Sequence, residues 1–207
     1  MISPLPNDDA SLDLKVTAHK SRNPLTAGTR MVVNASEPVF FWRPHEENGY
    51  LGQWFASPFT TPSPVNSDET VTFQNCETYM MYHKAILFND ISVAKQILLA
   101  ANDPKEVKAL GRKVRGFNEA KWGEKKFEIV VAANREKFGQ HVHLREQLLK
   151  TEGREIVEAS PMDKIWGIGF GKENALKNRY RWGKNLLGKA LMQVRDEYIA
   201  DQEKERK

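Results

Sequence analysis

One helix-like segment, TFQNCETYMMYHKA at residues 72–85, carries a carboxylate and an amine that could act together. Glu77 and Lys84 are seven residues apart, which is about two helical turns, so both side chains project from one face. Aromatic and methionine residues surround that face, as is typical of a half-buried helix. The two groups can form a structural ion pair, or they can belong to a catalytic site.

A second segment, EASPMDKIWGIGFG at residues 158–171, interrupts the helices that the sequence predicts. Its glycines allow backbone amides to approach a ligand closely, and Trp166 can stack on a planar group. It is not a dinucleotide-binding fingerprint, because the glycine spacing is wrong and we expect no strand before it. The alternative is an ordinary turn with a packed tryptophan.

Tryptophans recur in the irregular parts of the chain. Trp54, Trp122 and Trp166 lie in or beside glycine-containing segments. Tryptophan is the best stacking surface for a base or a sugar face, but it is also often buried in the core. The residue types alone leave both roles open.

The sequence predicts neither a metal site nor a cofactor. His141 and His143 are two residues apart, so on a helix they point to different faces. Cys76 is the only cysteine, which excludes an intrachain disulfide and a paired-cysteine zinc site. No phosphate-cradling GxxxxGK[ST] loop and no GxSxG elbow is present. A metal-independent reaction or a binding role remains.

The size and composition fit one sizeable domain. The chain has 207 residues, 40% of them hydrophobic, and a net charge of +4 with a pI of about 9.1. This mild excess is too small to imply a nucleic acid or a phosphate ligand. No apolar run approaches the roughly 20 residues of a membrane span, and the N-terminus has no signal pattern. We expect a cytoplasmic or nuclear monomer with no membrane contact.

Periodicity and turn signals predict an α+β fold, a mostly helical single domain with a small β-sheet or ribbons near the N-terminus. Residues 1–36 read as a flexible or loosely packed arm, and the charged end, 201–207, as a tail that frays. The intervening part, 37–200, forms the domain. Extended segments are expected at 38–44, 49–59 and 71–73, with a loop at 60–70. Helices are expected at 76–88, 91–101, 104–111, 124–140, 141–151 and from Asn185 onward, with caps at Asp90 or Ser92 and at Asp103.

Four sequence blocks together resemble the NADAR family (NAD and ADP-ribose associated), the YbiA-like N-glycosidases. The blocks are YLGQWFASPF, CETYMMYHKAILF, ALGRKV followed by FNEAKW, and EASPMDKIWGIG followed by WGKNLLGKALMQVR. Their order and spacing carry the resemblance, which runs from about Phe40 to Glu197. Gly52-Gln53 stands where the family commonly has Ser-Asn, so the amide is kept with an added methylene.

The resemblance implies a YbiA-like fold and hydrolysis of an N-glycosidic bond next to a phosphorylated ribose. Two substrate classes belong to the family: ADP-ribose attached to guanine in nucleic acid or nucleotides, and ribosylamino-pyrimidine phosphates of riboflavin biosynthesis. We expect the first, with an ADP-ribose-containing nucleotide or nucleic acid as the substrate partner. A third hypothesis, from a different class, is a non-catalytic ADP-ribose or nucleotide-binding module.

Cleavage of a C–N glycosidic bond builds positive charge at the anomeric carbon, which a carboxylate can stabilise. Glu77 and Asp163 are therefore the candidate catalytic carboxylates. Lys84 would either hold a phosphate or attack the sugar and form a Schiff base. Asn185 can bind a ribose hydroxyl or cap the last helix. The expected substrate-binding residues are Arg43, Arg112 and Lys184 for phosphates, Trp54, Trp122 and Trp166 for stacking, and Gln53, Gly167 and Asn185.

Overall fold

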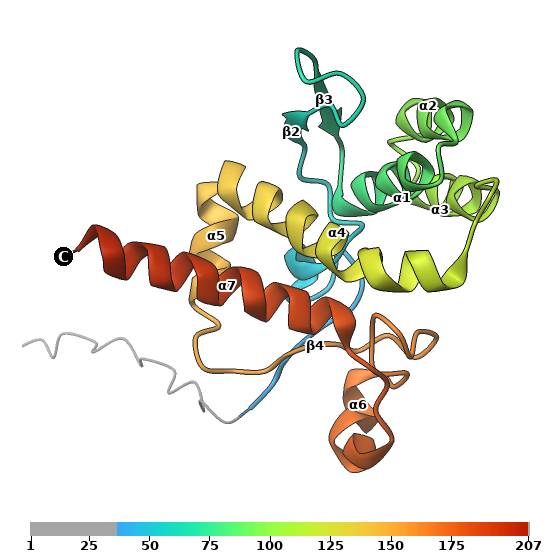
Figure 1. Ribbon diagram of the computed structural model, residues 1–207. Coiled ribbons are helices and arrows are strands. Elements are labelled where there is room, and N and C mark those ends of the chain that lie inside the picture. Colours follow the sequence, from blue (N-terminus) through green and yellow to red (C-terminus); the bar gives the residue numbers. More distant parts are fainter. Residues whose placement is uncertain (1–36, 207) are drawn as a thin grey trace, which may run out of the picture. The chain divides into compact units, whose positions relative to one another are not determined.

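The computed structural model describes residues 37–206, so the expected N-terminal arm lies outside the described residues. Most of this part of the chain is helical, and Figure 1 shows how its elements are arranged. The helices are α1 (Cys76–Leu87), α2 (Ile91–Leu99), α3 (Pro104–Arg112), α4 (Glu119–Gln140), α5 (Val142–Leu149), α6 (Lys172–Ala175) and α7 (Leu186–Glu205), with 3-10 helices η1 (Gly49–Leu51) and η2 (Leu176–Arg181). The strands are β1 (Val39–Phe41), β2 (Phe59–Pro62), β3 (Thr70–Phe73) and β4 (Ile156–Glu158).

Helix α1 is the centre of the described core. It packs against α2, α3 and α4, and α4 in turn packs along α7 (Figure 1). Asn75 starts α1, because its side chain accepts a hydrogen bond of 2.9 Å from the Thr78 amide. Most side chains of α1 are buried, including Glu77, so this helix carries polar groups into the interior.

The helix starts follow the capping residues of the sequence. The expected caps Asp90 and Asp103 accept hydrogen bonds from the first-turn amides of α2 and α3, and Pro104 opens α3. Asn118 caps α4, which therefore begins five residues earlier than the sequence predicted. Gly111 does not end α3. A Cβ at Gly111 would lie 2.0 Å from the Met81 sulfur, so this glycine allows α3 to approach α1 closely.

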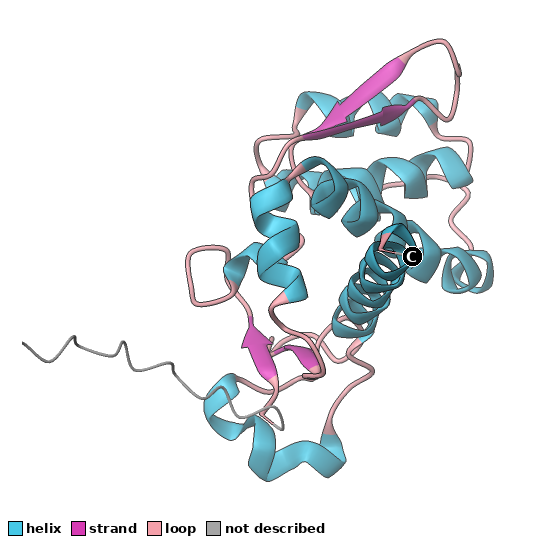
Figure 2. Ribbon diagram, turned by 90° about the vertical axis from the view of Figure 1, so that its left-hand side faces the viewer, coloured by secondary structure: helices cyan, strands magenta, loops and turns pink. Residues whose placement is uncertain are grey.

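The strands form two separate pairs, which lie on opposite sides of the helices in Figure 2. β2 and β3 are antiparallel, with Phe59 opposite Phe73. Most of β2 and the first residue of β3 fall in the segment 60–70 that the sequence predicted as a loop. β1 pairs in parallel with β4, with Phe40 opposite Val157. The prediction missed β4, and it assigned extended structure to residues that form η1. Although β4 does precede the glycine-rich loop, the glycine spacing still differs from a dinucleotide fingerprint.

The C-terminal part carries two further differences from the prediction. The short helices α6 and η2 occupy residues 172–181, which the sequence left without structure. Helix α7 continues to Glu205 and does not fray at 201. The predicted fold class is confirmed: the protein is a mostly helical single domain of the α+β class with small strand pairs.

Candidate active site

A cavity of about 480 Å³ opens between α1 and the loop that follows β4. That volume lies within the range of pockets that hold nucleotide-sized ligands. The cavity thus brings together two segments that the sequence analysis singled out, the Glu77 helix and the glycine-containing segment 158–171. The lining residues come from segments far apart in the chain: Trp42, Arg43, Pro44, Gly52, Gln53, Trp54, Glu77, Met80, Met81, Lys108, Trp122, Glu158, Ser160, Met162, Asp163, Trp166 and Leu187.

Glu77 lies in the first turn of α1 and is 4% exposed. Its Oε1 atom is buried and has no hydrogen-bond partner among the described residues. Burial raises the pKa of Glu77 to about 7, and the charge of Asp163 adds to this, while Lys108 and the Trp54 side chain act in the opposite direction. A carboxylate with this pKa changes its charge near neutral pH, as a catalytic group requires.

Glu158, the last residue of β4, is half-buried and brings a second carboxylate to the same cavity. Its Oε2 atom is buried and also has no partner in the part of the chain that the structure describes. Burial raises the pKa of Glu158 to about 8, and the charges of Asp163 and Glu77 push it in the same direction. Glu158 therefore holds its proton at neutral pH more firmly than Glu77 does.

Asp163 is the third carboxylate of the cavity, and its role in the loop is visible. Its Oδ1 atom accepts hydrogen bonds from the amides of Ile165, at 2.7 Å, and Trp166, at 2.8 Å. These bonds fold the loop into a turn and place the Trp166 ring in the cavity wall. Gly167 follows, where a Cβ would meet the Glu158 carbonyl oxygen at 2.8 Å. The glycine thus allows the loop to lie against the end of β4.

A chain of hydrogen bonds orients the Gln53 amide. Asn134 is fully buried, and its Nδ2 donates to the carbonyl of Val130 at 2.9 Å and to Gln53 Oε1 at 3.2 Å. The Cys76 thiol donates to Asn134 Oδ1 at 3.9 Å. The Gln53 oxygen is therefore occupied, and Nε2 remains as a buried donor with no partner among residues 37–206. The cavity wall therefore holds two groups without a partner among the described residues, the Gln53 Nε2 donor and the Glu77 Oε1 acceptor.

Four of the five tryptophans line the cavity, including the three predicted for stacking. Trp122 lies in the first turn of α4, not in the irregular segment that the sequence suggested. Trp42, which the prediction did not choose, carries the Arg43 guanidinium 4.2 Å from its ring centroid. Lys108 lies 6.0 Å from the ring centroid of Trp54. The cavity therefore combines aromatic walls with cations, an arrangement suited to a planar base and a phosphate.

Lys84 is not among the residues that line the cavity. Lys84 lies on the same face of α1 as Glu77. However, two helical turns separate the two residues by about 10 Å along the helix axis. Its ammonium donates to the Gly111 carbonyl at 2.8 Å and lies 5.6 Å from the ring centroid of Trp122. Burial lowers the pKa of Lys84, the direction that a nucleophilic amine needs. Its catalytic role stays a prediction.

The structure also places Arg112, Gly167, Lys184 and Asn185 outside the lining. Arg112 is exposed, and its charge helps to lower the pKa of Glu77. Asn185 adopts a left-handed conformation with φ of 49° and makes no side-chain cap. Instead its side chain accepts from the Glu158 amide at 3.1 Å and donates to the Ile156 carbonyl at 2.9 Å. Asn185 thus joins β4 to the start of α7, with both side-chain groups occupied.

Among residues 37–206, no group of three or more His, Cys, Asp or Glu side chains is arranged to hold a metal ion. No helix in the same residues is both long enough and apolar enough to span a membrane.

Comparison with known families decides what this cavity belongs to. The family described as NADAR domain matches residues 40–198. The chain belongs to the NADAR family. The matched range contains every lining residue of the cavity and, except for Val39, both strand pairs.

Similarity to individual proteins and to a solved structure agrees with this assignment. The NADAR chain is 46% identical over 149 residues to N-glycosidase R617 of Acanthamoeba polyphaga mimivirus, covering 71% of this chain and 86% of that protein. It is 32% identical over 150 residues to the riboflavin biosynthesis protein PYRR of Zea mays, covering 69% of this chain but only 22% of that protein. The NMR structure of Escherichia coli YbiA matches with a TM-score of 0.64 at 25% identity, covering 83% of this chain and 89% of that one. The predicted YbiA-like fold is confirmed.

Two ionisable lining residues of this NADAR protein, Glu158 and Lys108, were missed in the sequence. Glu158 begins the block EASPMDKIWGIG, and a β-branched run, IVE, ends at it, which is a short strand signal. Lys108 is four residues before Arg112, so both cations lie on one face of α3. These signals were present, but only the packed structure shows that both residues meet Glu77.

Proposed function

We propose that this protein is an N-glycosidase that hydrolyses the bond between ADP-ribose and guanine in ADP-ribosylated nucleic acid or nucleotides. The observation that carries the proposal is the pair Glu77 and Glu158 at one tryptophan-walled cavity. Each carboxyl group has one buried oxygen that finds no hydrogen-bond partner among residues 37–206. Relatives named N-glycosidase support a glycosidase hydrolase. The ADP-ribosyl substrate rests on the match between the cavity and a nucleotide.

The two carboxyl groups divide the reaction between them. As the bond from the anomeric carbon to nitrogen breaks, Glu158 gives its proton to the leaving nitrogen of the base. Glu77, ionised, stabilises the positive charge on the sugar and accepts one proton from the water whose oxygen bonds to the anomeric carbon. The products are the free sugar and the protonated base nitrogen. Transfer of one proton from Glu77 to Glu158 through solvent restores the starting state.

The remaining lining groups hold the substrate. The Asp163 charge raises the pKa of both glutamates, which favours the protonated state of Glu158. Trp54, Trp122 and Trp166 stack on the base or the sugar, as predicted from the sequence. Arg43 and Lys108 are the cations at the cavity, and both suit a pyrophosphate.

One observation favours a second candidate function. A relative is named as a riboflavin biosynthesis protein, which points to ribosylamino-pyrimidine phosphates as substrates. Such a substrate has the same bond from an anomeric carbon to nitrogen but one phosphate instead of two. The carboxylate chemistry is unchanged, so only the binding residues separate the two functions.

The deciding experiment incubates the protein with both substrate classes in parallel. We expect an ADP-ribosylated guanine oligonucleotide to yield free ADP-ribose and the unmodified oligonucleotide, measured by mass spectrometry. Glu158→Gln and Glu77→Gln serve as controls with strongly lowered activity, and Glu128→Gln, an exposed residue of α4, as the matched active control. Turnover of the pyrimidine substrate alone would support the riboflavin function. Tight binding of ADP-ribose without cleavage of either substrate would support a non-catalytic module.

A further inference from the structure

The segment 164–184 differs in charge from the rest of the chain. It carries six lysine and arginine residues and one acidic residue, Glu173. The whole chain has a net charge of +4, so the rest of the protein is close to neutral. The positive charge is thus concentrated in about a tenth of the length. A concentration of this kind creates a local positive potential that the small net charge conceals.

Backbone hydrogen bonds place this segment beside the cavity. The Lys184 amide donates to the Lys164 carbonyl at 2.8 Å, and the Leu187 amide donates to the Trp166 carbonyl at 3.0 Å. Trp166 and Leu187 both line the cavity. The two ends of the basic segment therefore run along the loop that forms one wall of the site.

Only part of the positive charge is used inside the fold. Lys172 pairs with Glu47 at 2.8 Å, and Arg179 pairs with Glu155 at 2.7 Å. Lys164, Lys177 and Lys184 are exposed and make no ion pair within residues 37–206. These three ammonium groups are available to a partner that carries negative charge.

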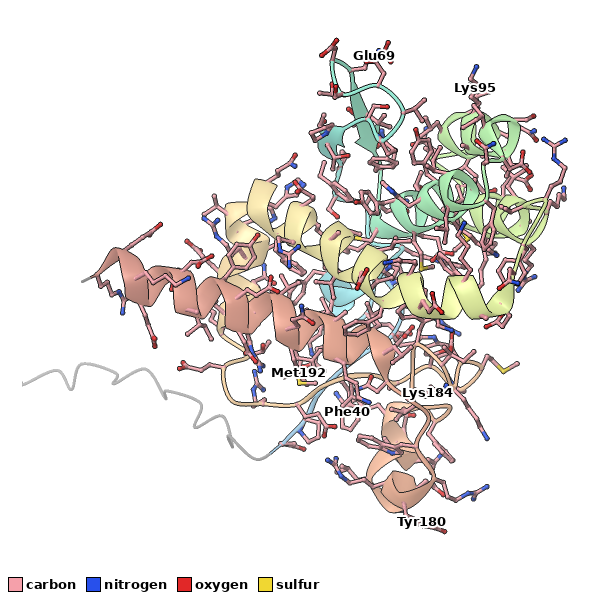
Figure 3. The ribbon with its side chains drawn as sticks, viewed as in Figure 1. Phe40, Glu69, Lys95, Tyr180, Lys184 and Met192 are labelled. Atoms are coloured by element: carbon pink, nitrogen blue, oxygen red, sulfur yellow. The ribbon has the colours of Figure 1, made fainter. Side chains whose placement is uncertain are left out.

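An exposed aromatic residue lies within the same segment. Tyr180, in η2, is 86% exposed, and Figure 3 shows its side chain projecting at the end of the α6–η2 region. Met162, at the cavity wall, is 91% exposed. An exposed aromatic ring in a segment that also carries unpaired cations suits a surface where a base stacks while the phosphates are neutralised.

We propose that the basic surface, defined as Lys164, Lys177, Tyr180, Arg181 and Lys184, binds the backbone of single-stranded nucleic acid next to the cavity. The proposal rests on the proposed function, because a strand held here presents its modified base to Glu77 and Glu158. A base inside a duplex cannot reach an enclosed site, so the strand must be single or the base extruded. The surface therefore selects a polymer substrate, whereas the cavity alone selects a nucleotide.

Binding is tested with an unmodified single-stranded oligothymidylate, measured by fluorescence anisotropy at several salt concentrations. The test variant is Lys177→Glu/Tyr180→Ala/Arg181→Glu. We expect at least a tenfold weaker affinity and a shallower salt dependence, since each phosphate contact contributes a slope of about 0.7 for single strands. Lys177→Glu/Tyr180→Ala, which keeps the contacts of Arg181, should show a smaller loss in the same direction.

The matched control is Lys95→Glu/Leu99→Ala/Lys105→Glu, which makes the same change of charge and removes a similarly exposed apolar side chain. These residues lie on α2 and α3, and Lys95 projects at the opposite end of the view in Figure 3. The control should bind within twofold of the unmodified protein. Equal loss in both variants, or equal binding of a polyglutamate of the same charge, would show a general charge effect and overturn the proposal. So would wild-type protein that does not bind the oligonucleotide.

Cleavage rates of two substrates distinguish the proposed nucleic-acid surface from the proposed glycosidase function. ADP-ribosylated guanosine, which has no polymer backbone, should be cleaved equally by the wild-type and the triple variant. For the ADP-ribosylated oligonucleotide, kcat/KM should be at least tenfold lower in the triple variant than in the wild-type protein. Cleavage of neither substrate by the wild-type would reject the glycosidase function, while oligothymidylate binding would still report on the surface. Equal cleavage of both substrates by both proteins would reject the surface alone.

Discussion

At the scale of single residues, the site depends on two glutamates whose environments hold them in different protonation states. Burial raises the pKa of Glu77 to about 7 and that of Glu158 to about 8. Between these values, Glu77 is mostly ionised and Glu158 is mostly protonated, which is the combination that the proposed reaction needs. The same pair would be inactive if both carried a proton or both were ionised.

This leads to a prediction for the pH dependence of kcat/KM. Activity should rise through about pH 7 as Glu77 ionises and fall above about pH 8 as Glu158 loses its proton. The rates come from initial velocities measured in buffers of constant ionic strength. Glu158→Gln should lower the rate and remove the alkaline limb, because glutamine has no proton to lose in this range. An alkaline limb that survives in this variant would assign it to another group.

Glu77 should also make the protein less stable at high pH. Its pKa in the folded state is raised above the usual value of 4.5, so the folded protein binds more protons than the unfolded chain between these pH values. The free energy of unfolding contributed by Glu77 therefore falls as the pH rises, by on the order of 3 kcal/mol in total. Glu77→Gln should raise the melting temperature at pH 8.5 and have little effect at pH 4. A variant with lower stability at both pH values would contradict this sign.

The Gln53 amide provides a test of ligand recognition. Gln53→Glu keeps the shape and still accepts from Asn134, but an oxygen replaces the free Nε2 donor. If the substrate places an acceptor there, binding should weaken by about 1–3 kcal/mol, measured by calorimetry with ADP-ribose. Gln53→Met, which adds no charge, is the control for the effect of a new carboxylate. Affinity within twofold in both variants would show that the donor meets no ligand atom.

At the scale of elements, one buried lysine holds the segment that carries Gln53 and Trp54. Lys137, on α4, is fully buried, and its ammonium donates to the carbonyls of Tyr50 at 2.6 Å and Gly52 at 3.2 Å. Burial lowers its pKa, and the Phe138 ring lies 5.1 Å from the charge. The η1 region has no long helix or strand of its own, so this contact, together with the hydrogen bonds of Gln53 to Asn134 and to the Glu77 amide, fixes where it lies.

Lys137→Met should therefore affect both stability and activity. The substitution keeps an unbranched side chain but removes the lysine donor from the Tyr50 carbonyl, at a cost of roughly 1–3 kcal/mol. The Gly52 carbonyl loses one of its two donors and still accepts from the Phe55 amide at 3.3 Å. Urea unfolding should show the loss, and kcat/KM of the fully folded fraction should fall because Gln53 and Trp54 move. The control is Lys125→Met on the exposed face of the same helix, where only a surface pair with Glu128 is lost. Normal activity in Lys137→Met would show that η1 is held by other contacts.

The elements differ in how well the sequence predicted them, for local reasons. Helices with their own caps, such as α2 and α3, were found close to their starts because Asp90 and Asp103 act within a few residues. β4 was missed because it is three residues long and pairs with β1, more than a hundred residues earlier in the chain. The cap predicted at Asn185 was wrong for the same reason, since its side chain binds β4 and not its own helix. Local patterns carry no information on such distant partners.

At the scale of the whole described domain, the site is an assembly of distant segments. The lining comes from the region after β1, from α1, α3 and α4, from the loop after β4 and from α7. The sequence blocks identified most of these regions through the family resemblance, but helical spacing misled at one point. Glu77 and Lys84 share a face, yet only Glu77 reaches the cavity. Periodicity gives the direction of a side chain around an axis, and tertiary packing decides which position along that axis meets the ligand.

Because the site joins so many segments, a ligand that fills it should stabilise the fold as a whole. A ligand that binds only the folded state at a hundred times its Kd adds about 2.7 kcal/mol to the free energy of unfolding. We expect ADP-ribose to raise the melting temperature, and Trp166→Ala to reduce this shift by weakening affinity about 1–3 kcal/mol. Ribose 5-phosphate, which has one phosphate and no adenosine, is the comparison ligand and should give a smaller shift. A larger shift with ribose 5-phosphate than with ADP-ribose would mean that the cavity is built for the smaller sugar phosphate, and the riboflavin-type substrate would then be preferred.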